Sequence, residues 1–360
     1  MKSFVTHIST DFPAIIFFAL LLLHIQIINS DKESIVTKAD GLCLRGAAAL
    51  SVLLYHLAPL TENGVLLPKF YTFGAGALAV AMFFFLSGYG LQKQYLKNGD
   101  AYRKSFLKGR IPTVLIPLIL FAVLYRIAYY TLGKTYTFHD LISDICVGIP
   151  FVAHSWYLIT ILLFYLFFWL LMNLFKGYTC WMPIAACVWY LLYALICIKL
   201  KYLMYWYDTA CLLPVGMFCA VYEQRILNVV KEKWMWYSLL LITAVFFWFV
   251  IPWFYVHGLP MSIQLYYILS ISRVFFFTMM LLLLQVKIRI DNPVLRYLGK
   301  ISLEIYLIHG LIFYLLRGDY FYLTNEPLFC FLSLSGVLLF ASILSPIDRF
   351  LVRSWKQAVK

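Results

Sequence analysis

The chain has 360 residues, of which 64% are hydrophobic and 12% are charged. Soluble domains carry about 25% charged residues, so this composition excludes a protein whose whole surface faces water. The formal net charge of +13 comes from basic residues placed between apolar runs, which indicates membrane topology and not nucleic-acid binding.

Long apolar runs recur along the chain and predict an all-α polytopic membrane protein. A helix needs about 20 apolar residues to cross the hydrocarbon core of a bilayer. The first run has a poor signal-peptide n-region, with Lys2 set against Asp11, and no small-residue cleavage pattern, so we expect a retained helix. About eleven transmembrane helices are expected in all, over residues 12–29, 42–60, 73–92, 111–131, 156–175, 181–199, 205–222, 235–256, 263–285, 301–317 and 327–345.

The distribution of basic residues sets the expected orientation. With the N-terminus outside, 21 of the 29 Lys and Arg residues fall in inner segments and 6 fall in outer segments. Cytoplasmic loops carry such an excess, so we expect the N-terminus outside and the C-terminus in the cytoplasm. The weakest part of this prediction is the outer turn that carries Lys199 and Lys201, near residues 181–222.

No linker, low-complexity stretch or clear internal repeat divides the chain. We expect an extra N-terminal transmembrane helix and linker at 1–37, a membrane core at 38–348 and a short basic cytoplasmic tail at 349–360. Eight cysteines, most of them in apolar runs and none in a CxxC pair, are interpreted as packing residues. The sequence contains no HExxH, P-loop or GxGxxG motif, which predicts no bound metal and no nucleotide fold.

Ionisable groups inside the apolar runs are the first candidates for function, because they are costly in lipid. The second run carries Arg45 at its inner end and His56 eleven residues later. At about 100° per residue both side chains point the same way, roughly 16 Å apart along the helix axis. A general base at His56 and an anion-binding group at Arg45 would suit this spacing; a snorkelling arginine and a hydrogen-bonded packing histidine are the alternative. Arg273, in the middle of the ninth run, needs a partner that the sequence does not name.

The third run and the basic stretch after it supply further candidates. Ser87 and Gly88 lie among small residues that permit close helix packing, which alone would explain them. Lys108 and Arg110 precede a proline that suits the first turn of the next helix. These two cations either fix the topology or bind a phosphate-bearing cytosolic ligand.

Two later blocks complete the candidate residues. Trp156 and Tyr157 open the fifth run, where aromatic residues commonly anchor a helix at the membrane interface. Ser302, Tyr306 and His309 stand at i, i+4 and i+7 and share one helical face, with His309 near mid-membrane.

Taken in order, these blocks resemble the acyltransferase family 3 membrane proteins. The resemblance rests on the run from Asp40 to His56, on Phe84–Tyr89, on Lys108–Pro112, on Ser155–Leu158 and on Ile301–His309. Each block is weakly specific, but their order is that of the family, over about residues 38–345. The sequence departs from the family by its added first helix, and by lacking the glutamate that the larger subgroup often has soon after the tryptophan block.

The resemblance implies a ten-helix acyltransferase core in the inner or plasma membrane, preceded here by one extra helix. It implies transfer of an acyl group, typically acetyl, from cytosolic acyl-CoA as co-substrate to a hydroxyl of a cell-envelope carbohydrate or lipid-linked sugar. His56 and Arg45 match the family's essential histidine and its accompanying arginine. We expect Lys108, Arg110 and Ser87 on the acyl-CoA side, and Trp156, Tyr157, Ser302, Tyr306 and His309 on the acceptor side or in support.

The mechanism and the class of function each leave an alternative open. His56 would accept the proton of the acceptor hydroxyl, or else His56 or Ser87 would carry the acyl group covalently. A transporter or flippase without acyl transfer is the competing class, since buried Arg and His residues also line substrate pathways. A purely structural scaffold would make no use of Arg45 and His56. The expected partners are membrane lipid, acyl-CoA and the acceptor, with no nucleic acid and no tightly bound cofactor.

Overall fold

The computed structural model describes residues 2–27, 34–256 and 262–358, and about 80% of the chain is helical. Short 3₁₀ turns occur at Ala58–Leu60 and Met204–Trp206. The two strands are β1 (Ile25–Ile27) and β2 (Ile288–Ile290). The helices are α1 (Lys2–Leu22), α2 (Lys38–Leu57), α3 (Leu67–Thr72), α4 (Ala75–Arg110), α5 (Pro112–Thr131), α6 (Phe138–Cys146), α7 (Trp156–Leu174), α8 (Met182–Lys199), α9 (Leu212–Val221), α10 (Glu223–Glu232), α11 (Trp234–Val256), α12 (Ile263–Lys287), α13 (Pro293–Lys300), α14 (Ser302–Leu316) and α15 (Glu326–Ala358).

The expectation of an all-α polytopic membrane protein is confirmed. Within the described residues, seven helical segments are long and apolar enough to cross a membrane, and α13 with α14 forms an eighth candidate that is bent by 75°. One of the seven segments, Ala75–Thr131, contains both α4 and α5 and so covers two of the expected spans. The count of eleven and the orientation remain predictions.

Two of the expected spans differ in the structure. The span expected at 12–29 is helical only to Leu22, and residues 25–27 then pair antiparallel with β2, with Ile25 opposite Ile290; residues 28 and 29 lie outside the described part of the chain. The span expected at 205–222 contains a 3₁₀ turn and the ten-residue helix α9. Ten residues make about 15 Å of helix, which is too short to cross a bilayer alone.

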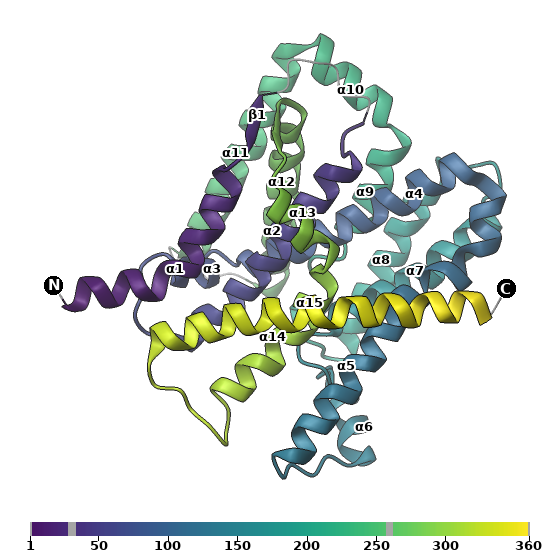
Figure 1. The fold of residues 1–360 in the computed structure, drawn as a ribbon. Helices are drawn as coiled ribbons and strands as arrows, with labels where there is room; N and C mark the ends of the chain where they lie inside the picture. Colours follow the sequence, from purple (N-terminus) through teal and green to yellow (C-terminus); the bar gives the residue numbers. More distant parts are fainter. Residues whose placement is uncertain (1, 28–33, 257–261, 359–360) are drawn as a thin grey trace.

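Helix α2 is the central element, and it packs against α4, α13 and α14 (Figure 1). Its start is defined by a capping box: the Thr37 side chain accepts the Asp40 N–H, and the Asp40 carboxylate accepts the Thr37 N–H. Arg289 of β2 forms an ion pair with the same carboxylate at 3.3 Å. These contacts fix where α2 begins, and therefore fix the height at which its later residues project.

Two pairs of glycines let helices meet backbone to backbone. Gly46 of α2 lies against α13 at Gly299, and Gly88 of α4 lies against α9 at Gly216. At all four positions a Cβ atom would overlap backbone atoms of the facing helix. Close approach of this kind is how membrane helices gain packing energy, because lipid supplies no hydrophobic force between them.

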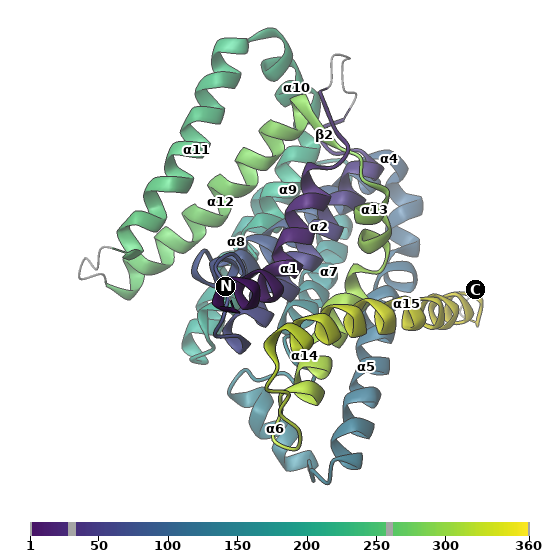
Figure 2. The same cartoon turned by 60° about the vertical axis from the view of Figure 1, so that its left-hand side comes forward.

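The N-terminal helix is attached to the rest of the molecule at its middle and just beyond its end. At its middle, the buried Asp11 carboxylate accepts the backbone N–H groups of Val65, Leu66 and Leu67 at 2.7–3.0 Å. Beyond its end, β1 pairs with β2. Helix α1 also packs against α2 and α15. By contrast, α11 and α12 form a hairpin that stands to one side of the bundle (Figure 2).

A polar cluster holds the segment before α2 in place. Glu223, the first residue of α10, accepts hydrogen bonds from the Ile35 N–H and from the Tyr89 hydroxyl, and it forms an ion pair with Lys93 at 3.0 Å. Ser34 donates to the same carboxylate. The cluster therefore joins α4, α10 and the chain entering α2.

Candidate active site

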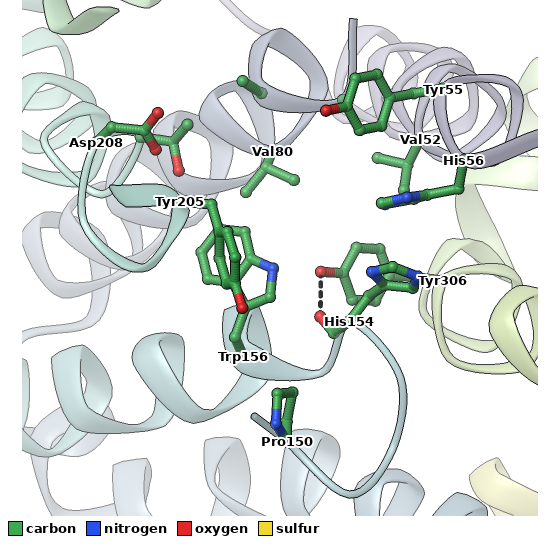
Figure 3. Close-up of a pocket in the computed structure, with 13 residues that line it drawn as sticks. Val52, Tyr55, His56, Val80, Pro150, His154, Trp156, Tyr205, Asp208 and Tyr306 are labelled. Carbon is green, nitrogen blue, oxygen red and sulfur yellow. Dashed lines mark hydrogen bonds between the residues drawn. The ribbon is translucent and has the colours of Figure 1, made fainter. Parts of the chain in front are cut away.

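A cavity of about 300 Å³ lies beside the C-terminal half of α2 (Figure 3). Val52, Tyr55 and His56 of α2 form one wall, and Asp208 and Tyr205 from the turns before α9 face them across the open space. The other lining residues are Gly76, Ala77 and Val80 of α4, Pro150 and His154 of the loop before α7, Trp156 of α7, Thr209 of the turn before α9, and Tyr306 of α14.

Three histidines from separate elements meet at this wall. The ring of His56 lies against that of His154, with centroids 3.7 Å apart and ring planes tilted by 30°. The ring centroid of His309 of α14 lies 5.2 Å from that of His56 and 5.0 Å from that of His154. The sequence pattern placed His56 and His309 among the candidate residues, and the structure brings them together. His154 was missed, because a histidine beside a tryptophan at a helix start was interpreted as part of an interface anchor.

His309 has a defined tautomer. Its Nδ1 atom lies 2.7 Å from the backbone carbonyl of Tyr306. A carbonyl only accepts hydrogen bonds, so Nδ1 carries the proton and Nε2 carries the lone pair. His309 is fully buried, and its Nε2 atom has no hydrogen-bond partner among the described residues. The cluster therefore contains a buried acceptor that the protein itself leaves unsatisfied.

The loop that carries His154 is held in an unusual conformation. The φ angle of His154 is +64°, in the left-handed region that non-glycine residues rarely adopt. The Tyr306 hydroxyl donates a hydrogen bond of 2.6 Å to the His154 carbonyl, as the dashed line in Figure 3 shows. Backbone strain of this kind costs about 1–3 kcal/mol and is concentrated at functional sites. Tyr306, a predicted site residue, thus fixes the position of the third histidine.

Arg45 lies toward the opposite end of α2. It is within electrostatic range of Tyr157, whose hydroxyl hydrogen-bonds to Ser87. The Tyr157 ring lies 5.6 Å from that of Tyr306, and Tyr306 lies 5.9 Å from His309. A row of aromatic side chains therefore connects the surroundings of Arg45 to the histidine cluster. The shared face of Arg45 and His56 remains a prediction.

The remaining predicted residues lie apart from the cavity wall or only partly on it. Trp156 lines the cavity, with its ring 5.3 Å from Tyr205. Ser302 donates its hydroxyl to the Gly299 carbonyl and does not line the cavity. Arg110 donates to the Tyr102 hydroxyl at 3.2 Å. Lys108 is exposed near the end of α4.

The cavity also holds a carboxylate that the sequence pattern did not single out. Asp208 Oδ2 accepts a hydrogen bond from Ser270, and Arg273 of α12 lies within electrostatic range. Oδ1 of Asp208 and the hydroxyl of Thr209 are buried, and neither has a hydrogen-bond partner in the part of the chain that the structure describes. An acidic residue inside an otherwise apolar run was the signal available for Asp208. The structure also supplies a counter-charge for Arg273.

These features define a polytopic helical membrane protein with an imidazole cluster and a carboxylate facing each other across a buried cavity. An imidazole beside an enclosed space is suited to moving a proton during acyl transfer. The sequence matches the model of the acyltransferase domain of acyltransferase family 3 over residues 43–345, and the chain belongs to this family. It is a membrane acyltransferase. No curated protein and no solved structure matches the chain.

Proposed function

We propose that this enzyme transfers an acyl group, acetyl in the simplest case, from cytosolic acyl-CoA to a hydroxyl of a cell-envelope carbohydrate or lipid-linked sugar at the plasma membrane. The observation that carries the proposal is the position of His56: in a chain that belongs to an acyltransferase family, its imidazole borders a buried cavity of about 300 Å³. Acyl-CoA enters as a co-substrate and not as a bound cofactor.

In the proposed reaction His56 acts as the general base. Its ring nitrogen accepts the proton of the acceptor hydroxyl as the oxygen attacks the thioester carbonyl. The carbon–oxygen bond forms, the carbon–sulfur bond breaks, and the imidazolium returns the proton to the departing thiolate. Direct transfer is favoured over an acyl-serine route, because Ser87 hydrogen-bonds to Tyr157 and is not among the cavity-lining residues.

The donor is proposed to lie along the Arg45 side of α2. Arginine and lysine bind phosphate oxygens strongly, and Arg45, Lys108 and Arg110 all belong to segments predicted to be near the cytosol. A pantetheine arm would extend from these cations past Tyr157 toward His56. The spacing of Arg45 and His56, eleven residues along one helix, is in keeping with an extended arm.

The acceptor is proposed to occupy the cavity itself. Trp156 and Tyr205 offer ring faces, while Asp208 and Thr209 offer buried oxygens with unused hydrogen-bonding capacity. Sites that combine apolar faces with a few placed polar groups suit ligands that carry both kinds of surface. A sugar ring, with its apolar faces and its rim of hydroxyls, has this character.

Acetyl-CoA labelled in the acetyl group, supplied to membranes that contain the enzyme, tests the proposal. We expect label in the envelope glycan with the wild type, and a loss of roughly 100-fold or more with His56→Ala at equal expression. His139→Ala, which removes an exposed histidine on α6, is the matched control and should transfer normally. Equal transfer by wild type and His56→Ala would refute the assignment of His56.

A further inference from the structure

The histidine cluster contains more imidazoles than acid–base catalysis requires. One base suffices for the proposed reaction, yet His56, His154 and His309 offer ring nitrogens that all lie within 4.8 Å of one another. Among the described residues this is the only group of three or more histidine, cysteine or carboxylate side chains placed in this way. Neutral imidazole is a preferred ligand of Zn²⁺ and its neighbours in the first transition series.

The hydrogen bond of His309 is the kind that metal-binding histidines make. Metal-ligating imidazoles commonly donate their second N–H to a backbone carbonyl, which fixes the tautomer and the ring orientation. His309 donates Nδ1–H to the Tyr306 carbonyl at 2.7 Å, and its buried Nε2 lone pair has no partner within the described chain. A second hydrogen bond, from Tyr306 to the His154 carbonyl, holds another member of the cluster.

The ring separations are close to those of a three-histidine site. Imidazoles that meet at one Zn²⁺, with Zn–N bonds of about 2.0–2.1 Å, have their ring centroids about 5 Å apart. His309 lies 5.2 Å from His56 and 5.0 Å from His154. The centroids of His56 and His154 are only 3.7 Å apart, with ring planes tilted by 30°, so these two rings must turn to bring their edges toward a shared ion. Both border the cavity, which gives them space to turn.

We propose that His56, His154 and His309 bind a single divalent cation of the Zn²⁺ class, with the fourth coordination position open to the cavity. A nitrogen that coordinates the cation cannot also accept a proton. Cation binding at this cluster and general-base catalysis by His56 therefore exclude each other. This mutual exclusion rests on the proposed function, whereas the cation site itself does not. The cation acts as a reversible inhibitor that is recognised by imidazole nitrogen.

Binding is tested on the full-length protein, purified in detergent with any affinity tag removed. Calorimetric titration with ZnCl₂, checked by metal analysis after dialysis, should show one Zn²⁺ per chain. His309→Ala and His154→Ala should each weaken the affinity by roughly 100-fold. Because His309 is fully buried, His309→Gln is a second variant that keeps most of the volume and polarity of the site. His139→Ala removes an exposed histidine outside the cluster and should bind as the wild type does.

The spectrum of bound Co²⁺ gives an independent readout of the site. Intense visible absorption from a four-coordinate ion should appear with the wild type and disappear with His309→Gln. Absence of stoichiometric binding, or equal affinity in His309→Gln and His139→Ala, would overturn the metal site. These measurements require no acyl transfer, so the binding result holds or fails separately from the proposed function.

The exclusion is tested in the labelled-acetyl assay. Zn²⁺ should inhibit transfer with a midpoint equal to the measured Kd, and a chelator should restore the full rate. Loss of activity on chelation, or stimulation by Zn²⁺, would overturn the exclusion and make the cation part of the catalyst. A protein that binds one Zn²⁺ but transfers no acyl group under any condition would refute the proposed function while leaving the site intact.

Discussion

Gly88→Ala tests whether the contact between α4 and α9 is as close as the structure places it. A Cβ atom at Gly88 would overlap the Leu213 carbonyl, and α9 would have to withdraw by about 1 Å before that separation reached even 3.0 Å. A gap of this size forfeits a quarter to a half of each dispersion contact across the interface. We expect a destabilisation of about 1–3 kcal/mol, the usual cost of overpacking.

Gly90→Ala is the matched control, because Gly90 lies on the same helix with nothing within 4 Å of the Cβ position. Alanine has a higher helix propensity than glycine by up to about 1 kcal/mol, so Gly90→Ala should leave stability unchanged or raise it. Of these two identical substitutions, two residues apart on α4, only Gly88→Ala should therefore lower stability.

The stability of both variants can be measured by thermal unfolding in detergent, with a dye that fluoresces when it reacts with thiols. The exposed Cys146 and Cys180 react in the folded protein and set the baseline, whereas the buried Cys43 and Cys330 react only as the bundle opens and give the transition. The midpoint should fall by several degrees for Gly88→Ala, at roughly 2 °C per kcal/mol, and should not fall for Gly90→Ala. Equal midpoints for the two variants would show that α4 and α9 are not in backbone contact.

Three further variants test other parts of the molecule. Burial alone would raise the pKa of Glu223, but its hydrogen bonds outweigh burial and hold the pKa below the usual 4.5. Glu223→Gln should therefore lower stability by about 1–3 kcal/mol at neutral pH. The difference in stability from the wild type should shrink as the pH falls below 4.5, because the wild-type carboxylate then takes up a proton. The exposed Glu232→Gln is its control, and a pH-independent difference would contradict the assignment. Asp208→Asn keeps the shape of the cavity wall but removes the negative charge. Label transfer should fall, while the acyl-CoA concentration that gives the half-maximal rate stays constant. A change confined to the acyl-CoA dependence would place Asp208 on the donor side instead. Tyr306→Phe leaves the His154 carbonyl without its donor and should cost about 1–3 kcal/mol and slow transfer; wild-type rate and stability together would show that this hydrogen bond does not position the loop.

The parts of the structure that depend on local pattern were predictable from the sequence. Long apolar runs are sufficient to predict membrane helices, because lipid requires the backbone to bond within each segment. The spacing of Arg45 and His56 follows from helix geometry alone, and both residues belong to one helix, α2.

The parts that were missed depend on contacts between distant segments. His154 reaches the site from a loop in a left-handed conformation, which no periodicity reveals. The sequence pattern predicts a helix through residues 25–27, where the structure has a strand, because the partner strand lies more than 260 residues away and an apolar tripeptide suits either structure. Asp208 lies inside the apolar run for which the sequence predicts a transmembrane span at 205–222, and the pattern does not single it out. In the structure, the turn that carries Asp208 supplies a wall of the cavity.

The attachments of α1 bear on what proteolysis could do to this protein. The Asp11 carboxylate holds α1 at its middle and the β1–β2 ribbon holds the chain just beyond its end, both independently of the peptide bonds at residues 28–33. A cut anywhere in that interval would divide the polypeptide in two without separating the pieces, and the shorter fragment would migrate with the longer one until the detergent denatured the bundle. The first helix is thus held by non-covalent contacts of the kind that hold a separate subunit, although it belongs to the same chain. We expect α1, synthesised as a separate peptide, to reassemble with a chain that begins at residue 34.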